Sequence, residues 1–279
     1  MPRCILVPLL ACAAWPQTAP PPPAPEAQAR EIIQSALADK NPDTRKLAAT
    51  ALSLGGPHDP FLTEVERLMN DKDVEVRLAA ISSLGEWKTK SSLAVLRTAL
   101  NDEVPEVSFA AARALYNAND PAGKALLLAV LAGDAKVASG FITKQKRDAL
   151  RMLHTPRTTL MFGLKQGVGF VPVPGLGEGV SSLQGLLTDP GVSGRAMAAL
   201  LLGKEKDAET MSALRDALDD KDWSVRAAAV HALALRNDPS VEKDLVPLFD
   251  DKHQGVRLRA AAGYLRLEWV RKPARAARK

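Results

Sequence analysis

The chain has 279 residues, of which 46% are apolar but only 4% aromatic, and Ala and Leu dominate the apolar set. Small and unbranched side chains favour packed helices over sheets, which draw on β-branched and aromatic residues. The net charge of +5 arises entirely in residues 266–279, where six basic residues stand against one acid, so the remainder is neutral. A neutral repeat region argues against a nucleic-acid-binding groove and predicts no nucleic-acid partner.

Residues 1–14 resemble a secretory signal peptide, with Arg3 followed by a short apolar stretch and then small residues. Leu9-Leu10-Ala11-Cys12 resembles the lipobox of bacterial lipoproteins, in which the cysteine becomes the acylated first residue. Cleavage without lipidation, or a disordered N-terminal tail on a cytoplasmic protein, are the alternatives. We expect an exported protein, either periplasmic or anchored through Cys12 to a membrane of a bacterial envelope.

Residues 15–29 are rich in Pro and Ala, which predicts a stiff, extended linker between this N-terminal segment and the folded domain. Cys4 and Cys12 are the only cysteines of the chain. The predicted folded part therefore contains no thiol for a disulfide or a metal site.

A motif with Asp and Arg six residues apart recurs through the rest of the chain. Each Arg is followed seven residues later by Leu or Tyr, and the five copies carry Arg45, Arg77, Arg195, Arg226 and Arg257. A sixth copy keeps this register but has Ser108 in place of Arg. Successive copies lie 31 or 32 residues apart within each run, which indicates a repeat architecture.

Each repeat is predicted to form two helices. In the second copy, Leu62, Val65 and Leu68 have helical spacing and predict the first helix. The Asp71-Lys72-Asp73 segment then turns the chain and supplies a cap for the second helix, whose alanines permit close packing. A lone pair cannot bury its apolar stripe, so each unit must stack on its neighbours.

This pattern resembles the HEAT family, and most closely the short HEAT-like repeats of the phycobilin-lyase type. The resemblance covers residues 30–270 and implies an armadillo-like, all-α, right-handed α-solenoid of about seven two-helix repeats. It also implies that the second helices line the inner surface and that the protein binds other proteins. It does not imply lyase activity, because these repeats occur in many proteins without it.

The repeated Asp and Arg invite a catalytic interpretation. A catalytic group is needed once, however, whereas these residues recur in nearly every unit. We therefore interpret them as a ladder of helix caps and ion pairs between units.

The repeat breaks between Ser108 and Arg195. A degenerate unit is predicted first, with one helix at residues 126–131 and another near 141–153. A Gly/Pro-rich insertion follows at about 156–186, and nine of the 18 glycines fall between Gly163 and Gly194. Insertions in solenoids often emerge on the binding face. Candidate partner-binding residues there are Phe162, Phe170, Val171 and Leu176, although a loop that only covers core is an alternative.

No reaction centre is recognisable elsewhere. The four histidines lack metal-ligand spacing, there is no His-Glu pair of the kind that di-iron HEAT hydroxylases use, and the glycine spacing fits no nucleotide loop. We expect no catalytic residue, no metal site and no cofactor. Trp223 stands in a turn of the repeat, where it is a candidate partner contact or a local packing residue.

Residues 271–279 are rich in Ala, Arg and Lys and are predicted to form a basic disordered tail. Taken together, the sequence predicts a non-enzymatic scaffold that binds a protein partner in the cell envelope. Two alternatives stay open: a cytoplasmic lyase or cofactor-handling protein of the phycobilin-lyase type, and nucleic-acid binding through the basic tail.

Overall fold

The structure, a computed structural model, describes residues 24–132 and 194–276. Both segments consist of α-helices, the second with short 3-10 turns as well, and no strand occurs within them. The first segment contains seven helices: α1 Pro25–Leu37, α2 Pro42–Gly55, α3 Phe61–Leu68, α4 Val74–Trp87, α5 Lys90–Ala99, α6 Pro105–Asn117 and α7 Pro121–Ala132.

The second segment begins at the second helix of a repeat. Its α-helices are α11 Gly194–Leu202, α12 Ala208–Asp216, α13 Trp223–Leu235, α14 Glu242–Leu245 and α15 Gln254–Ala276. The 3-10 turns η2 (Ala217–Asp219), η3 (Pro239–Val241) and η4 (Val246–Asp250) extend α12 and α14 into complete first helices. The predicted all-α repeat fold is thus confirmed in both segments.

The second helices start where the repeat motif places them. Asn41 caps α2 by accepting from the Asp43 amide, Asp73 caps α4 by accepting from the Glu75 and Val76 amides, and Asp222 caps α13. Each cap satisfies amides that have no partner within the helix. The predicted capping role of the turn residues is confirmed at these three helices.

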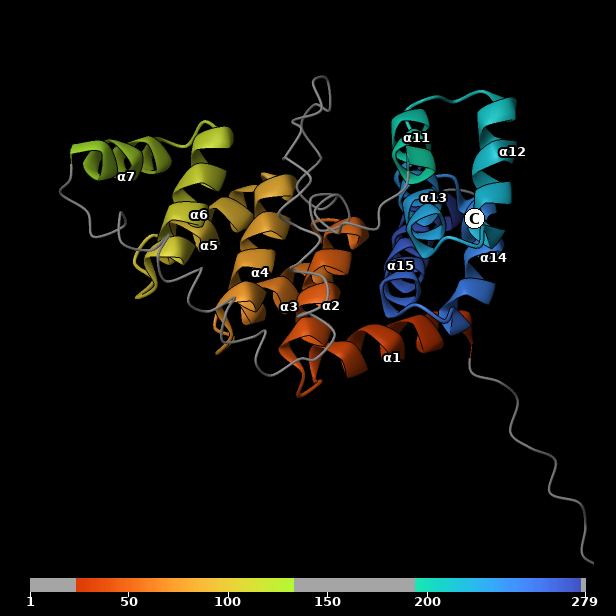
Figure 1. Cartoon of the computed structure of the whole chain (residues 1–279), viewed down its shortest axis with the longest axis horizontal. Coiled ribbons are helices and arrows are strands. Elements are labelled where there is room, and N and C mark those ends of the chain that lie inside the picture. The colour runs from red at the N-terminus through yellow and green to blue at the C-terminus, as the bar shows by residue number, and fades with distance from the viewer. Residues whose placement is uncertain (1–23, 133–193, 277–279) are drawn as a thin grey trace, which may run out of the picture.

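The second helices form one continuous row whose order differs from the order of the chain. Packing runs from α11 to α13, α15, α2, α4 and α6, so the last repeat lies against the first one. Figure 1 shows the result as an arc, with α7 at one tip and α11 and α12 at the other. The first described segment ends at Ala132, at one tip of the row, and the second begins at Gly194, at the other tip. We call the contact of α15 with α1 and α2 the seam.

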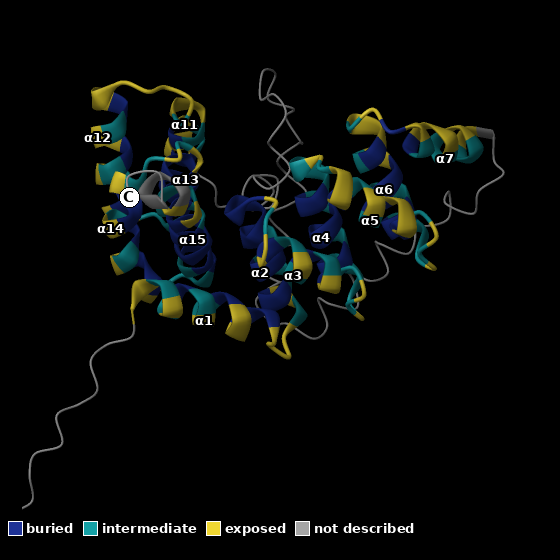
Figure 2. Ribbon diagram, turned by 180° about the vertical axis from the view of Figure 1, so that it is seen from behind, coloured by how far each residue is buried: buried dark blue, intermediate teal, exposed yellow. Residues whose placement is uncertain are grey.

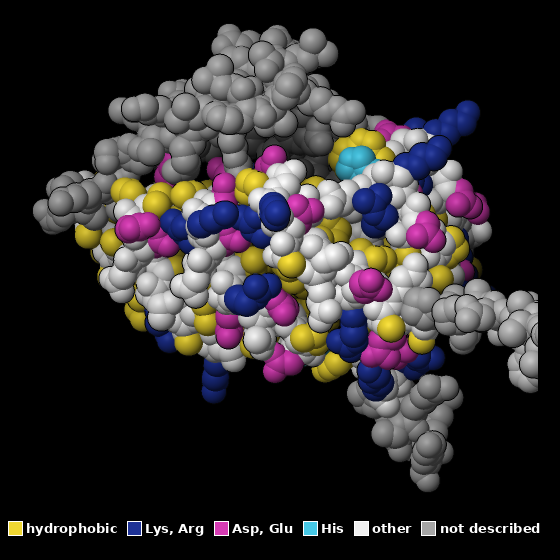
Figure 3. Space-filling view, turned by 90° about the horizontal axis from the view of Figure 1, so that it is seen from below, with side chains coloured by type: hydrophobic (Ala, Val, Ile, Leu, Met, Phe, Trp, Pro, Cys, Tyr) yellow, Lys and Arg dark blue, Asp and Glu magenta, His cyan; other side chains and the backbone are white. Residues whose placement is uncertain are grey.

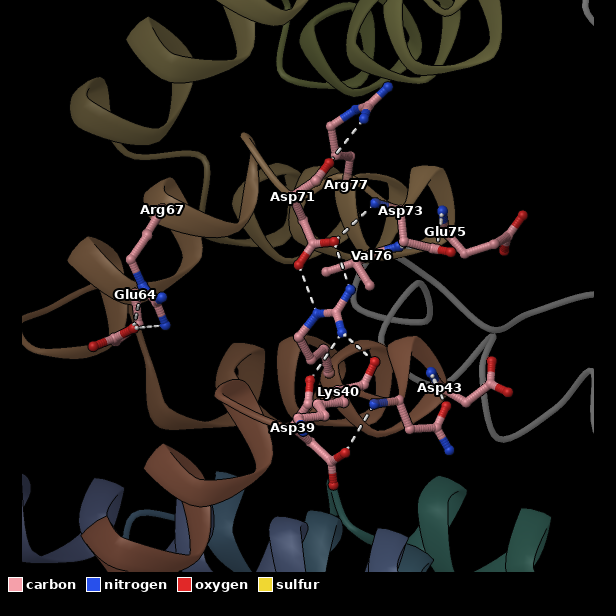
Figure 4. A network of polar contacts seen from close by, with 12 residues as sticks. Asp39, Lys40, Asp43, Glu64, Arg67, Asp71, Asp73, Glu75, Val76 and Arg77 are labelled. Carbon is pink, nitrogen blue, oxygen red and sulfur yellow. Dashed lines mark hydrogen bonds and ion pairs between the residues drawn. The ribbon is translucent and has the colours of Figure 1, made fainter.

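Within each run, arginines of one unit bind the turn of the next, and Figure 4 shows this network around Asp71. Arg45 donates to both carboxylate oxygens of Asp71 at 2.7 and 2.9 Å, and also to the carbonyls of Asp39 and Lys40. The Arg45 guanidinium holds the pKa of the Asp71 carboxyl below its usual value.

Three further rungs repeat this contact. They are Arg77–Asp102, Arg195–Asp220 and Arg226–Asp251. The predicted ladder between units is therefore confirmed. Where Ser108 replaces the arginine, its hydroxyl donates to the Pro105 carbonyl, 3.0 Å away, and the ladder of these arginines stops.

Small residues let neighbouring second helices approach closely. A Cβ atom at Gly85 of α4 would lie 3.0 Å from the Cβ of Ala114 on α6. A Cβ atom at Gly263 of α15 would lie 3.0 Å from the Cβ of Ala234 on α13. Side chains larger than hydrogen at these two positions would push the helices apart.

The seam has its own set of contacts in place of a ladder rung. If the ladder continued across the seam, Arg257 would pair with the carboxylate of Asp39. Among the described residues, Arg257 donates only to the carbonyls of Asp251 and Lys252. Residues further along α15 make the contact instead. Arg266 donates to the carbonyl of Leu54 at 3.1 Å, and the Lys272 ammonium lies 3.0 Å from the Glu26 carboxylate.

An aromatic pair completes the seam. The indole of Trp269 stacks on the imidazole of His58, with ring centroids 4.2 Å apart and an angle of 7° between the planes. His58 lies in the loop after α2, while Trp269 lies near the end of α15. The contact therefore joins residues that are more than 200 positions apart in the sequence.

The helices extend beyond both predicted limits of the solenoid. α1 starts at Pro25, inside the predicted linker 15–29, because Pro suits the first turn of a helix. α15 continues to Ala276, inside the predicted tail 271–279, where Arg271 pairs with Glu242 and Lys272 with Glu26. The tail boundary at 270 is thus corrected, because these ion pairs hold the basic residues against the fold.

Cleavage between the two described segments should leave them associated, because α15 packs on α1 and α2 along the seam. A protease site inserted within residues 133–193 of the full chain allows this to be measured. After complete cleavage, we expect both fragments to elute together in size-exclusion chromatography at micromolar concentration, and to separate only in denaturant. Two independent peaks under native conditions would contradict the seam.

Candidate binding surface on the second helices

The second helices lie on the inner side of the arc, where α12 and α14 lie outside α11, α13 and α15 (Figure 1). By the register of the repeat, each second helix carries one stripe of equivalent side chains. The stripe comprises the residues one, two and five positions after the repeat arginine or Ser108. We call it the inner stripe: Lys46, Leu47 and Thr50 on α2; Leu78, Ala79 and Ser82 on α4; Phe109, Ala110 and Arg113 on α6; Ala196, Met197 and Leu200 on α11; Ala227, Ala228 and His231 on α13; Leu258, Arg259 and Ala262 on α15.

The two halves of the inner stripe differ in exposure. On α2, α4 and α6 most of these side chains are half-buried, among them Leu47, Leu78 and Phe109. On α13 and α15 all of them are buried, and those two helices are dark blue along most of their length in Figure 2. The half-buried apolar residues of the stripe thus lie on the N-terminal segment and, as Met197 and Leu200, on α11 at the other tip of the row.

Two basic groups lie in the buried half of the inner stripe. His231 on α13 and Arg259 on α15 are each only 6% exposed. Burial lowers the pKa of Arg259 to about 10, with no carboxylate acting in the opposite direction. Burial, together with the charges of Arg259 and Arg266, lowers the pKa of His231 to about 3. His231 is therefore neutral at physiological pH.

Trp223 stands at the first position of α13 and is half-buried. Its indole stacks on the imidazole of His253 in the turn of the next unit, with centroids 3.9 Å apart and 9° between the planes. A role for Trp223 in partner binding stays a prediction. Cys12, Phe162, Phe170, Val171 and Leu176, together with the insertion 156–186, lie outside the described residues.

The described surface offers little for other chemistry. No group of three or more His, Cys, Asp or Glu side chains within the described residues could hold a metal ion. None of the helices in these two segments is long and apolar enough to cross a membrane. On the face seen in Figure 3, Lys and Arg side chains lie among Asp and Glu, a mixture that offers no continuous basic track.

A family model of HEAT repeats matches residues 62–139 and 181–266, which is more than half of the chain. The chain belongs to the HEAT-repeat family. Among solved structures, it is similar to human deoxyhypusine hydroxylase in complex with glycerol, at 20% identity and a TM-score of 0.33. That likeness covers 88% of this chain and 97% of the other, and it carries no inference about function. Among curated proteins, none matches this chain.

Arg259 and Arg266 are functional candidates that the repeat pattern concealed. Arg259 occupies the repeat position at which other units of this chain have Leu47, Ala79 and Ala228. A charged residue at a position that is otherwise apolar is the feature of the sequence that distinguishes it. In the sequence, Arg266 is one of the six basic residues of the C-terminal charge excess. Arg266 contacts α2 because α15 packs against α2 at the seam, and no local sequence motif predicts that packing.

The buried neutral His231 should make stability depend on pH. In the unfolded chain its pKa is near 6.5, so between pH 7 and pH 5 the unfolded state binds a proton that the folded state does not. Stability is therefore lost as pH falls, by about 2 kcal/mol over this interval. We expect His231→Gln to remove most of this loss, as measured by urea unfolding at both pH values.

His58→Gln provides the matched control, because burial lowers the pKa of His58 in the same direction, though this side chain is less deeply buried. It should remove a smaller part of the pH dependence. An unchanged difference between pH 7 and pH 5 in His231→Gln would show that the imidazole is not buried in its neutral form.

Proposed function

We propose that this HEAT-repeat scaffold binds a protein partner along the inner stripe of α2, α4 and α6, catalyses no reaction, and acts in a bacterial envelope after export. One observation carries the proposal. Half-buried apolar side chains recur on the same side of three successive second helices, as Leu47, Leu78 and Phe109.

The chemistry of this surface suits an extended protein ligand. Apolar residues alternate there with Lys46, Thr50, Ser82 and Arg113, which can supply polar contacts at the rim of an interface. The Lys46 ammonium already lies 3.2 Å from the Glu75 carboxylate of the next unit. Stacked repeats present such a surface as an elongated strip, which fits a helix or an extended segment better than a small molecule.

The binding surface can be tested with matched charge insertions. Leu78→Glu places a carboxylate on the inner stripe, where it would have to be desolvated against an apolar partner. Thr98→Glu places the same charge on an exposed position of the first helix α5. We expect Leu78→Glu to weaken capture of a specific envelope protein at least tenfold, while Thr98→Glu captures it as the wild type does.

Both variants should first be shown to unfold within a few degrees of the wild type, since Leu78 is half-buried. Equal capture by the two variants would refute the inner stripe as the binding surface. Capture of nucleic acid that is lost on removal of residues 270–279 would instead favour the basic tail. A bound tetrapyrrole in protein purified from the cytoplasm would favour a lyase-type function.

Export and lipidation are tested through the two cysteines. Radiolabelled fatty acid should be incorporated into the wild type and into Cys4→Ser, but not into Cys12→Ser. Membrane fractionation should follow the label. A mature, unlabelled protein released into the periplasm would show cleavage of the signal without lipidation. A protein of unprocessed mass in the cytoplasm would overturn export.

A further inference from the structure

One large aromatic side chain at the seam is only partly covered. The indole of Trp269 stacks one of its faces on the imidazole of His58, and Trp269 is still 49% exposed. Because His58 covers one face, this exposure comes largely from the opposite face and from the edges of the ring. The exposed Pro57 precedes His58, and the ring of Phe61 contacts His58 edge-on. We call Trp269, His58 and Pro57 the seam patch.

The start of α1 lies close to the seam patch. The Lys272 ammonium of α15 is 3.0 Å from the carboxylate of Glu26, which stands in the first turn of α1. Lys272 follows Trp269 by three positions on α15, so their Cβ atoms lie about 5–6 Å apart on neighbouring positions of the helix surface. The chain segment that precedes α1 therefore ends beside the exposed indole.

This preceding segment has the composition of a polyproline ligand. Residues 20–23 are four consecutive prolines, and Ala24 and Pro25 follow them. Ala24, at the N-cap of α1, has φ −56° and ψ 141°, which is close to polyproline II. Consecutive prolines favour the same conformation, so little entropy is lost when they bind. Five residues of polyproline II span about 15 Å, enough to reach Trp269 from the start of α1.

A second Trp–His stack of this chain lies at the other end of the second helices. Trp223 stacks on His253 with nearly the same geometry, at a centroid distance of 3.9 Å and an interplanar angle of 9°. Trp223 is the first residue of α13, however, whereas Trp269 lies in the last third of α15. Of these two stacks, the one with the more exposed indole is the one beside the start of α1.

We propose that residues 20–23 dock on the seam patch, with their proline rings against the open face of Trp269. Proline-rich segments characteristically bind aromatic side chains, and a proline ring packs on an indole without giving up an N–H donor. Tethering favours the chain's own segment over a separate ligand, because its effective concentration at the patch is of millimolar order. The docking uses no residue of the inner stripe on α2, α4 and α6, so it does not rest on the proposed function.

The docking is tested first in the full-length chain labelled with 5-fluorotryptophan. Phe substitutions of Trp15, Trp87 and Trp223 assign three fluorine resonances and leave that of Trp269 by exclusion. A Ser/Gly variant carries Pro20→Ser, Pro21→Gly, Pro22→Ser and Pro23→Gly, which makes this segment a flexible coil. We expect this variant to shift the Trp269 resonance and to leave that of Trp223 in place. Pro16→Ser, outside the proline run, should shift neither of the two.

A peptide with the sequence of residues 16–24 supplies the ligand separately. It should bind the Ser/Gly variant about tenfold more tightly than the wild type, in which the tethered segment competes for the patch. Within the Ser/Gly variant, Trp269→Leu should weaken the peptide about tenfold, because leucine has no flat aromatic face. Trp223→Leu is the matched control and should leave the affinity unchanged. The same peptide with Ser and Gly at positions 20–23 should not bind.

The two measurements fail independently of the fold. The fluorine experiment compares chains with the same folded residues, so it decides even if Trp269→Leu is destabilised. An unshifted Trp269 resonance in the Ser/Gly variant would overturn the docking, as would equal affinity of the peptide for the Trp269→Leu and Trp223→Leu proteins. A Trp269 resonance that moves with protein concentration would assign the patch to the proline run of a second copy and overturn docking within one chain.

Discussion

The packing of α15 against α1 and α2 is the contact on which the rest of the molecule depends. A two-helix unit cannot bury its apolar stripe alone, so the first repeat needs a neighbour on both sides. α3 and α4 cover one side, and the last repeat covers the other. Two runs of repeats that are separated in the sequence thereby become one row. At the seam, Arg266, Trp269 and Lys272 replace the ion-pair ladder that joins units elsewhere.

Much of each repeat could be predicted from the sequence, because its determinants are local. The turn acid, the cap and the next arginine lie within seven residues, as Asp71, Asp73 and Arg77 do, and the structure places them as expected. The order of the row could not be predicted. Every repeat offers a similar apolar face, so periodicity does not say which unit lies beside the first one. Arg266 was visible only as a basic residue before a predicted tail.

The buried Arg259 shows the same limit at the scale of side chains. Arg259 follows Arg257 by two residues, and a pattern that tracks one arginine per repeat passes over the second. Its position within the repeat distinguishes it, because the other units have small or apolar residues at the equivalent position. The burial of His231 beside α15 could not be predicted without the packing of α13 on α15, because the two helices belong to different repeats.

Arg266 contacts the second helix on either side of its own. From α15, its guanidinium donates to the Leu54 carbonyl at the end of α2 and to Oδ1 of Asn237, just after the end of α13. One side chain thereby links the last two repeats to the first one at the seam. Because the half-buried stripe of α2, α4 and α6 begins at this seam, a partner anchored there would engage both segments of the scaffold at once.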